Sequence, residues 1–391
     1  MFPKLRFKEF DGDWLKLKYK DVLTIKYGKD HKSLNDGDIP VYGTGGLMRH
    51  VNKYLYDGES ILIGRKGTID KPKYINEKFW TVDTLFYTEI KENIVPLFLF
   101  QHALEVNWLG LNEATGVPSL NTTSIYNIDI SIPSKEEQTK IASFLSNVDE
   151  KISQLTQKHE LLSQYKQGMM QKLFSQQIRF KADDGSEFGE WEEVKFSGIF
   201  NFHQTNSYSR ALLAEYGEIM NIHYGDIHTK FSMLFDVNKE SVPFLNDEVD
   251  TSKIAKEQFL KVGDLVIADA SEDYKDIGKS IEVISLNNQK VVAGLHTYIA
   301  RPVKPFALGF CGYMMQTFPV REQIKKLATG ISVLGISKTN LGKVELKVPS
   351  LEEQTKIANF LSSIDQKIEV VAQQIEQAKQ WKKGLLQQMF V

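Results

Sequence analysis

The chain has 391 residues, enough for two or three ordinary domains, and its 42% apolar and 25% charged residues are typical of a globular protein. A single cysteine, Cys311, excludes a disulfide framework and a cysteine-based zinc site, and it suits a reducing cytosol. The net charge of −2 argues against a protein that simply coats DNA, so any DNA-binding face must gather its positive charge locally. With no leader pattern and no apolar run long enough to span a bilayer, a cytoplasmic protein is expected.

Residues 1–132 are expected to form a mixed α/β domain with short strands, in which Gly58–Gly64 predicts a turn that enters a buried strand. The neighbouring loops are rich in glycine and in basic and polar side chains, which pair with base edges and phosphates. A turn or a solvated loop is the plain alternative for each of them. The residues predicted to contact DNA are Lys29, His31, Lys32, Tyr42, Thr44, Arg49, His50, Arg65 and Lys66.

A long helix is predicted next, in residues 133–177. Pro133 ends the preceding strand, Ser134 stands where an N-cap belongs, and Glu137 completes a capping-box pattern. Apolar residues then recur at alternating spacings of four and three, which is typical of a coiled-coil seam. The first half of this seam consists of Ile141, Leu145, Val148, Ile152 and Leu155.

Residues 178–348 predict a second mixed α/β domain, with Gly263–Ala268 as another turn that enters a buried strand. Cys311 lies in the apolar stretch LGFCGYMM and is expected in the core. Polar loops are again the predicted DNA contacts. The more ordinary interpretation of His223 and His228 is that at least one of the two is simply packed within the domain. The predicted contacts are His203, Gln204, Asn206, Tyr208, Arg210, His223, Tyr224, His228, Lys230 and Lys275.

The last segment, residues 349–391, repeats the first helix. Ile132–Phe174 aligns without a gap on Val348–Phe390, and about half of the positions are identical. Further upstream, Ala114-Thr115-Gly116 matches Ala328-Thr329-Gly330, two residues out of register. The chain is therefore two copies of one unit, a globular segment followed by a helix. The second seam repeats the first with Ile357, Leu361, Ile364, Ile368 and Val371.

Connectivity predicts how the helices pair. The first helix runs directly into the second globular segment, so the second helix must run back to meet it, in an antiparallel coiled coil with a pseudo-twofold axis. A helix of about 40 residues is about 60 Å long. Such a spacer suits the recognition of two DNA half-sites. The alternative is that each helix packs only on its own domain.

The block PSKEEQTKIASFLSNVDEKI and its repeat PSLEEQTKIANFLSSIDQKI, the start FPKLRF and the Gly-Thr-Gly-Gly loop together resemble the specificity subunits of type I restriction–modification enzymes. The resemblance covers essentially the whole chain. It implies two target-recognition domains, two long helices, no catalysis in this chain, and double-stranded DNA with a bipartite, gapped site as the ligand. It also implies that the helices dock two methyltransferase subunits, which methylate adenine N6 with S-adenosylmethionine, in a complex with two ATP- and Mg²⁺-dependent restriction subunits.

Two other classes remain open from the residues themselves. Asp264, with Asp273-Tyr274-Lys275 after it, loosely matches a divalent-metal nuclease site. Two protein-binding domains on a spacer, without nucleic acid, would explain the near-neutral charge. The chain has no Asn-Pro-Pro-Tyr or Asp-Pro-Pro-Tyr element, no strand-linked G-x-G-x-x-G and no G-x-x-x-x-G-K-[ST] loop.

Overall fold

The structure, a computed structural model, describes residues 3–390; Met1, Val391 and the Phe2 of the FPKLRF start lie outside the described residues. The chain divides into two compact units. Unit 1 comprises Met1–His159 and Val371–Val391, and unit 2 comprises Glu160–Val370. The predicted boundaries, 1–132, 133–177, 178–348 and 349–391, follow the secondary structure, whereas compactness assigns part of each long helix to each unit.

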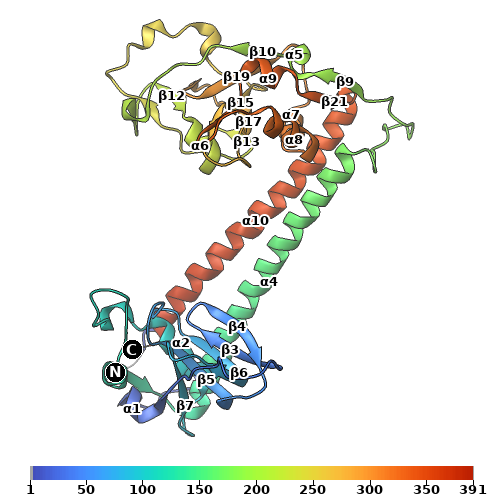
Figure 1. The fold of residues 1–391 in the computed structure, drawn as a ribbon. Helices are drawn as coiled ribbons and strands as arrows, with labels where there is room; N and C mark the ends of the chain where they lie inside the picture. Colours follow the sequence, from blue (N-terminus) through green and yellow to red (C-terminus); the bar gives the residue numbers. More distant parts are fainter. Residues whose placement is uncertain (1–2, 391) are drawn as a thin grey trace. The chain divides into compact units, whose positions relative to one another are not determined.

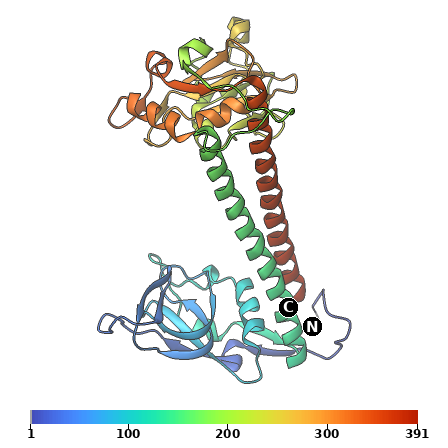
Figure 2. The ribbon, with the colours of Figure 1, turned by 90° about the vertical axis from the view of Figure 1, so that its right-hand side faces the viewer.

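Unit 1 is built on a six-stranded sheet with the order β2-β7-β5-β6-β3-β4, in which β3 and β6 are parallel and the other neighbours antiparallel. Strands β1 and β8 form a separate antiparallel pair. The curled sheet lies beside α2 and the beginning of α4 (Figure 2). The elements are β1 (Leu15–Lys18), α1 (Tyr19–Val22), β2 (Leu23–Tyr27), β3 (Ile39–Gly43), β4 (Gly46–Val51), β5 (Tyr56–Gly64), β6 (Lys73–Thr81), β7 (Leu85–Ile90), α2 (Pro96–Glu105), η1 (Leu109–Leu111), α3 (Thr122–Tyr126) and β8 (Asp129–Ile132).

Unit 2 holds a five-stranded sheet, β10-β19-β15-β17-β13, and a four-stranded sheet, β11-β14-β12-β18, with the short pairs β16-β20 and β21-β9. Its elements are β9 (Glu192–Lys195), α5 (Phe196–Ile199), β10 (Phe200–His203), η2 (Arg210–Leu212), β11 (Leu213–Ala214), β12 (Ile219–Ile222), α6 (Tyr224–Thr229), β13 (Leu234–Asp236), β14 (Phe244–Leu245), η3 (Thr251–Lys253), η4 (Lys256–Gln258), β15 (Leu265–Ala268), β16 (Ala270–Ser271), β17 (Ser280–Ser285), β18 (Lys290–Ala293), β19 (Thr297–Pro302), α7 (Phe310–Met315), α8 (Phe318–Leu327), β20 (Leu334–Gly335), α9 (Lys338–Gly342) and β21 (Glu345–Val348).

The two long helices are α4 (Lys135–Phe174) and α10 (Leu351–Met389) (Figure 1). In unit 1, the returning end of α10 lies along the beginning of α4 (Figure 2), and both join the core that contains Phe86 and Phe98. In unit 2, the end of α4 and the beginning of α10 share the core around Phe310. Among the ten predicted seam residues, Ile152 and Ile368 are half-buried and the others are buried. The antiparallel pairing is therefore confirmed within each unit, and the helices do not pack only on their own domains.

Each unit contains the same ion pair between the helices. In unit 2, Lys166 Nζ lies 2.5 Å from a carboxylate oxygen of Asp365. In unit 1, Lys382 Nζ lies 2.7 Å from a carboxylate oxygen of Asp149. Lys382 and Asp365 are the repeat equivalents of Lys166 and Asp149. Because both lysines stand at seam positions and meet an aspartate only in this alignment, the pairs favour the observed antiparallel register.

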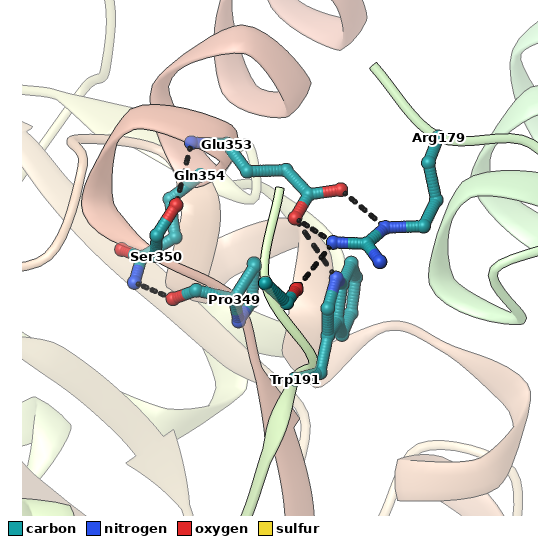
Figure 3. A network of polar contacts seen from close by, with 7 residues as sticks. Arg179, Trp191, Pro349, Ser350, Glu353 and Gln354 are labelled. Atoms are coloured by element: carbon teal, nitrogen blue, oxygen red, sulfur yellow. Dashed lines mark hydrogen bonds and ion pairs between the residues drawn. The ribbon is translucent and has the colours of Figure 1, made fainter. Parts of the chain in front are cut away.

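The two helix starts also repeat a buried arginine–glutamate pair, and Figure 3 shows the copy at the start of α10. Arg179 Nε and Nη2 donate to the two carboxylate oxygens of Glu353, at 3.0 and 2.7 Å, and Nη2 donates to Gly189 O at 2.7 Å. Trp191 Nε1 donates to Glu353 as well, at 3.0 Å. In unit 1, Arg6 binds Glu137 in the same way, with both distances 2.7 Å.

This network corrects the capping-box prediction. Ser134 and Ser350 do accept from the backbone N–H of Glu137 and Glu353, at 3.3 and 3.4 Å. Both glutamate side chains, however, bind arginine instead of the backbone N–H of the capping serine. A buried carboxylate is stabilised far more by a guanidinium than by one neutral N–H, so each glutamate anchors the segment that leads into its domain.

No helix within residues 3–390 is both long and apolar enough to cross a membrane.

Candidate nucleic-acid interface

In both units, the predicted DNA contacts are held by corresponding strands and the segments that follow them. This shared arrangement of strands is the strand frame. Strand β5 in unit 1 and β15 in unit 2 each pair with the strand that follows in the equivalent position, β7 or β19. Immediately after β5, Arg65 N donates to Thr84 O at 2.8 Å; immediately after β15, Asp269 N donates to His296 O at 3.1 Å. Arg65 and Asp269 therefore occupy the same position of the frame, and so do Thr84 and His296.

Two further pairs of segments coincide. Val82 N donates to Tyr42 O at 3.1 Å, and Gly294 N donates to Ile222 O at 2.9 Å, which aligns the β3–β4 turn with the beginning of α6. Lys29 N donates to Thr81 O at 2.8 Å, and Asn206 N donates to Ala293 O at 3.0 Å. The structure thus brings three predicted segments together in unit 1, around Lys29, Thr44 and Arg65, and their equivalents in unit 2 include two predicted segments, 203–210 and 223–230.

In unit 1 the segments around Lys29 and Thr44 line a pocket of ≈ 690 Å³, together with residues 82–84. Arg65 stands beside it: its Nη1 donates to Asp83 O at 3.1 Å, and its guanidinium carbon lies 5.4 Å from the centroid of the Tyr27 ring. Lys66 is exposed next to it. The pocket lining includes the predicted residues His31, Lys32 and Thr44, together with Asp30, Gly43, Gly45, Met48, Val82, Asp83 and Thr84.

Three other predictions in unit 1 fit less well. Arg49 and His50 lie on strand β4 rather than in a loop, because residues 46–51 pair with β3. Arg49 is engaged within the protein, with Nη2 2.6 Å from a carboxylate oxygen of Asp36. Tyr42 donates to Glu77 at 2.7 Å, and burial, together with that bond, raises the pKa of Tyr42 to about 12. His50 remains exposed, as do Lys29 and Lys32.

In unit 2, the polar composition of residues 224–229 predicts a loop, but these residues form helix α6, because His223 caps its first turn. His223 Nδ1 accepts from Gly225 N at 3.1 Å, and Arg210 Nη2 also lies 3.1 Å from this nitrogen. Burial and the charge of Arg210 lower the pKa of His223. Arg210 and Lys230 both contact Asp226, whose carboxylate is fully buried, at 3.0 and 3.1 Å.

The Tyr224 ring lies near three of the histidines of unit 2. Its ring centroid lies 4.7 Å from that of His223, 6.1 Å from that of His228 and 5.4 Å from that of His296. His228 Nε2 lies 2.9 Å from Ala270 O, so this histidine already has a partner within the protein. Tyr224 itself is half-buried.

The remaining predicted residues of unit 2 lie in several different places. Gln204, Asn206 and Tyr208 line a polar pocket of ≈ 310 Å³ with Lys253 and Gln258. Asn206 Nδ2 also donates to Asn221 Oδ1 at 2.8 Å. His203 is half-buried on β10, and burial lowers its pKa. Lys275 is exposed on the loop after β16 and lies 3.3 Å from the Asp273 carboxylate.

The nuclease alternative is contradicted by the placement of its carboxylates. Asp264 is buried and accepts from Arg301 Nε and Nη2, both at 2.8 Å, and from Lys261 N at 2.7 Å. Asp273 is instead exposed and binds its own neighbour Lys275. Across residues 3–390, no three histidine, cysteine, aspartate or glutamate side chains are arranged to hold a metal ion. Cys311 is buried as expected, and burial raises its pKa.

Three residues of this face were missed from the sequence. Asp226, Asp269 and His296 carry no local motif, and only the pairing of distant strands brings them together. One signal was present: His296 closely follows Gly294 in a short polar interruption between two apolar runs. The structure gives His296 a left-handed backbone, with φ 57°.

Comparison with known proteins identifies one family along most of the chain. The family described as type I restriction modification DNA specificity domain matches residues 11–164 and again residues 189–380. The type I restriction enzyme MjaVIII specificity subunit of Methanocaldococcus jannaschii is 28% identical, over 98% of this chain and 95% of that protein. The putative MjaX specificity subunit of the same organism is 24% identical, over 98% of this chain and 94% of that protein.

Solved structures share the fold. The crystal structure of a type I restriction-modification S subunit from M. genitalium superposes with a TM-score of 0.64 at 14% identity, over 100% of this chain and 99% of that one. A chain from a study of complex assembly and conformational transition in a type I R-M system gives a TM-score of 0.55 at 14% identity, with 97% of each chain covered. From the doubled family match, which spans most of its length, this chain belongs to the family of type I restriction–modification DNA specificity subunits.

Proposed function

We propose that this chain selects the DNA site for a type I restriction–modification complex, and that each unit recognises one half of a bipartite, gapped sequence. One observation carries this: the same strand frame occurs in both units, and its equivalent positions hold different polar side chains. Arg65 in unit 1 corresponds to Asp269 in unit 2, and Thr44 corresponds to Tyr224. On this proposal, the shared frame would present both sets of side chains to base edges, and different side chains would select different bases.

The partners follow from this role. Two methyltransferase subunits, with S-adenosylmethionine, would modify adenine N6, and two restriction subunits would use ATP and Mg²⁺. The chain itself would contribute no catalytic group, in keeping with the specificity-subunit names of its relatives. The target adenine must leave the stack to be methylated, so the duplex would be distorted at the site. The complex would act in the cytoplasm, where the cell's DNA lies.

Selection from a random duplex pool tests this proposal. The full chain, together with its methyltransferase partner, is incubated with the pool, and bound duplexes are sequenced. The expected result is one motif with two defined halves and a gap of constant length. Enrichment of a single continuous motif, or of no motif, would contradict the assignment. Binding should weaken steeply as salt is raised, because phosphate contacts release counterions.

A further inference from the structure

The first residue after the central strand of each unit, Arg65 after β5 and Asp269 after β15, has a firmly held backbone. It is held by the same two backbone bonds in both units: Arg65 O accepts from Leu120 N, and Asp269 O accepts from Ile336 N, both at 2.9 Å. In the second bond, Arg65 N donates to Thr84 O and Asp269 N donates to His296 O, just before the neighbouring strand begins. A backbone fixed on both sides gives a side chain little freedom, which is what base recognition requires.

In unit 2 this place holds a carboxylate and an imidazole. Asp269 Oδ1 lies 3.1 Å from His296 Nδ1, and the exposed fractions of the two side chains are 19% and 49%. Asp269 therefore lies mostly inside, and His296 extends toward solvent. The Tyr224 ring, 5.4 Å away between centroids and at 76°, packs against the imidazole from α6.

The backbone of His296 is strained. A φ of 57° is left-handed, a conformation that costs a side-chain-bearing residue about 1 kcal/mol or more relative to glycine. Such strain persists where surrounding contacts enforce it, and it gathers at binding sites. Here the contacts are the Asp269 pair, the backbone bond from Asp269 N, and the Tyr224 ring.

We propose that Arg65 and His296 are the base-contacting residues that distinguish the two half-sites, and that Asp269 positions His296. This inference rests on the proposed function. Arg65 spends one of its five N–H donors on Asp83 O, which leaves donors for the O6 and N7 acceptors of guanine. In the neutral tautomer whose Nδ1–H donates to the Asp269 carboxylate, Nε2 of His296 is an acceptor, which matches the amino group of adenine or cytosine.

The assignment therefore predicts the chemistry of each half-site. The half recognised by unit 1 contains a guanine that depends on Arg65. The half recognised by unit 2 contains an adenine or cytosine that depends on His296 and Asp269. Neither dependence crosses to the other half.

The test maps N6-methyladenine at base resolution in a host that carries single variants of the chain with intact partner subunits. His296→Gly is the most informative, because glycine accepts the left-handed backbone and the variant should therefore still fold. The preference for one base of the unit 2 half should fall about tenfold. Arg65→Ala should lower the preference for one guanine of the other half by about tenfold to a hundredfold.

Asp269→Asn tests positioning. It should relax the same base as His296→Gly, whereas a purely structural effect would reduce methylation at every site and leave the motif unchanged. Lys20→Ala and Lys343→Ala, at exposed positions away from this face, serve as controls and should preserve the wild-type motif.

The inference is overturned if His296→Gly and Arg65→Ala leave both halves of the motif unchanged, or if either variant lowers methylation uniformly. For a variant that methylates nothing in the host, binding is measured on duplexes that differ at single bases. The inference is then overturned if the base preference is unchanged or if binding falls equally for every duplex. The wild-type map separates the two levels of the argument. If it shows no bipartite motif, the proposed function has failed; if it shows one that the variants do not alter, only the inference has failed.

Discussion

Single residues at the helix starts connect each domain to its helix. Glu137 and Glu353 are each 1% exposed, and each binds an arginine from the segment that leads into its domain. The Glu-Glu-Gln block thus combines an exposed glutamate, a buried anchoring glutamate and a glutamine that joins two neighbouring segments. In unit 1 that glutamine, Gln138, accepts from Val95 N at 2.8 Å and donates to Pro133 O at 3.0 Å.

Glu353→Gln should destabilise the chain by about 3 kcal/mol, because it leaves the mostly buried guanidinium of Arg179 without a countercharge. Urea unfolding of the full chain measures this. Glu352→Gln, one residue earlier on the exposed side of α10, is the matched control and should change the free energy of unfolding by less than about 0.5 kcal/mol. Equal effects from both variants would show that the arginine network contributes nothing special.

His102 makes the stability of unit 1 depend on pH. It is buried beside Tyr19 and Phe390, with its Nδ1 3.0 Å from the Tyr19 hydroxyl oxygen, and burial lowers its pKa to about 4. The folded state keeps this imidazole neutral, whereas the unfolded chain takes up a proton near pH 6.5. Stability from this group is therefore complete above pH 6.5 and is lost as the pH falls toward 4, by about 3 kcal/mol in all.

Unfolding of the wild type and of His102→Gln at pH 7 and pH 5 checks this expectation. The variant should lose less stability between the two pH values than the wild type does. His50→Gln, at an exposed position, should keep the wild-type difference. A wild-type difference that His102→Gln does not reduce would assign the pH dependence to other groups.

At the scale of elements, the sequence predicted what local periodicity determines. The helices, their ends, the seam and the strands around Ile61–Ile63 and Val266–Ile267 all follow from spacing along the chain. The common strand frame could not be found this way, because an insertion hides it. Strand β6 of unit 1 is continuous, whereas unit 2 divides its counterpart into β17 and β18 with a turn at Asn287 and Asn288.

Local periodicity also fails to explain the displaced Ala-Thr-Gly motif and to predict the helix in residues 224–229. The residue that bonds to the frame after the Ala-Thr-Gly motif is Leu120 in unit 1 and Ile336 in unit 2. Unit 2 has two more residues between the motif and this bonding residue. The polar composition of segment 224–229 has no helical period and therefore predicts a loop. A histidine cap and burial of Ile227 stabilise a short helix there.

The helix register offers a test by charge exchange. Asp149→Lys should destabilise unit 1 by about 1–2 kcal/mol, since it places two lysines together at the seam. Adding Lys382→Asp should recover much of that loss, because the exchanged pair can form again. Urea unfolding of the two single variants and the double variant gives the coupling energy. A double variant no more stable than the sum of the single effects would remove this ion pair from the account of the register.

At the scale of the whole molecule, the chain is a tandem repeat in which each long helix begins in one unit and ends in the other. Inserting one heptad in each helix keeps the seam in phase and adds about 10 Å per helix at 1.5 Å per residue. The gap between the half-sites should then lengthen by about 3 base pairs at 3.4 Å each. Motif mapping with the elongated chain measures the gap. An unchanged gap would show that the helices do not set it.

The most direct test of the account is to map N6-methyladenine at base resolution in the host before and after deletion of the gene for this chain. The account predicts that methylation disappears at one bipartite, gapped motif and at no other, and that the wild-type gene restores it. Persistence of every methylated motif after deletion would contradict the central claim that this chain selects the site.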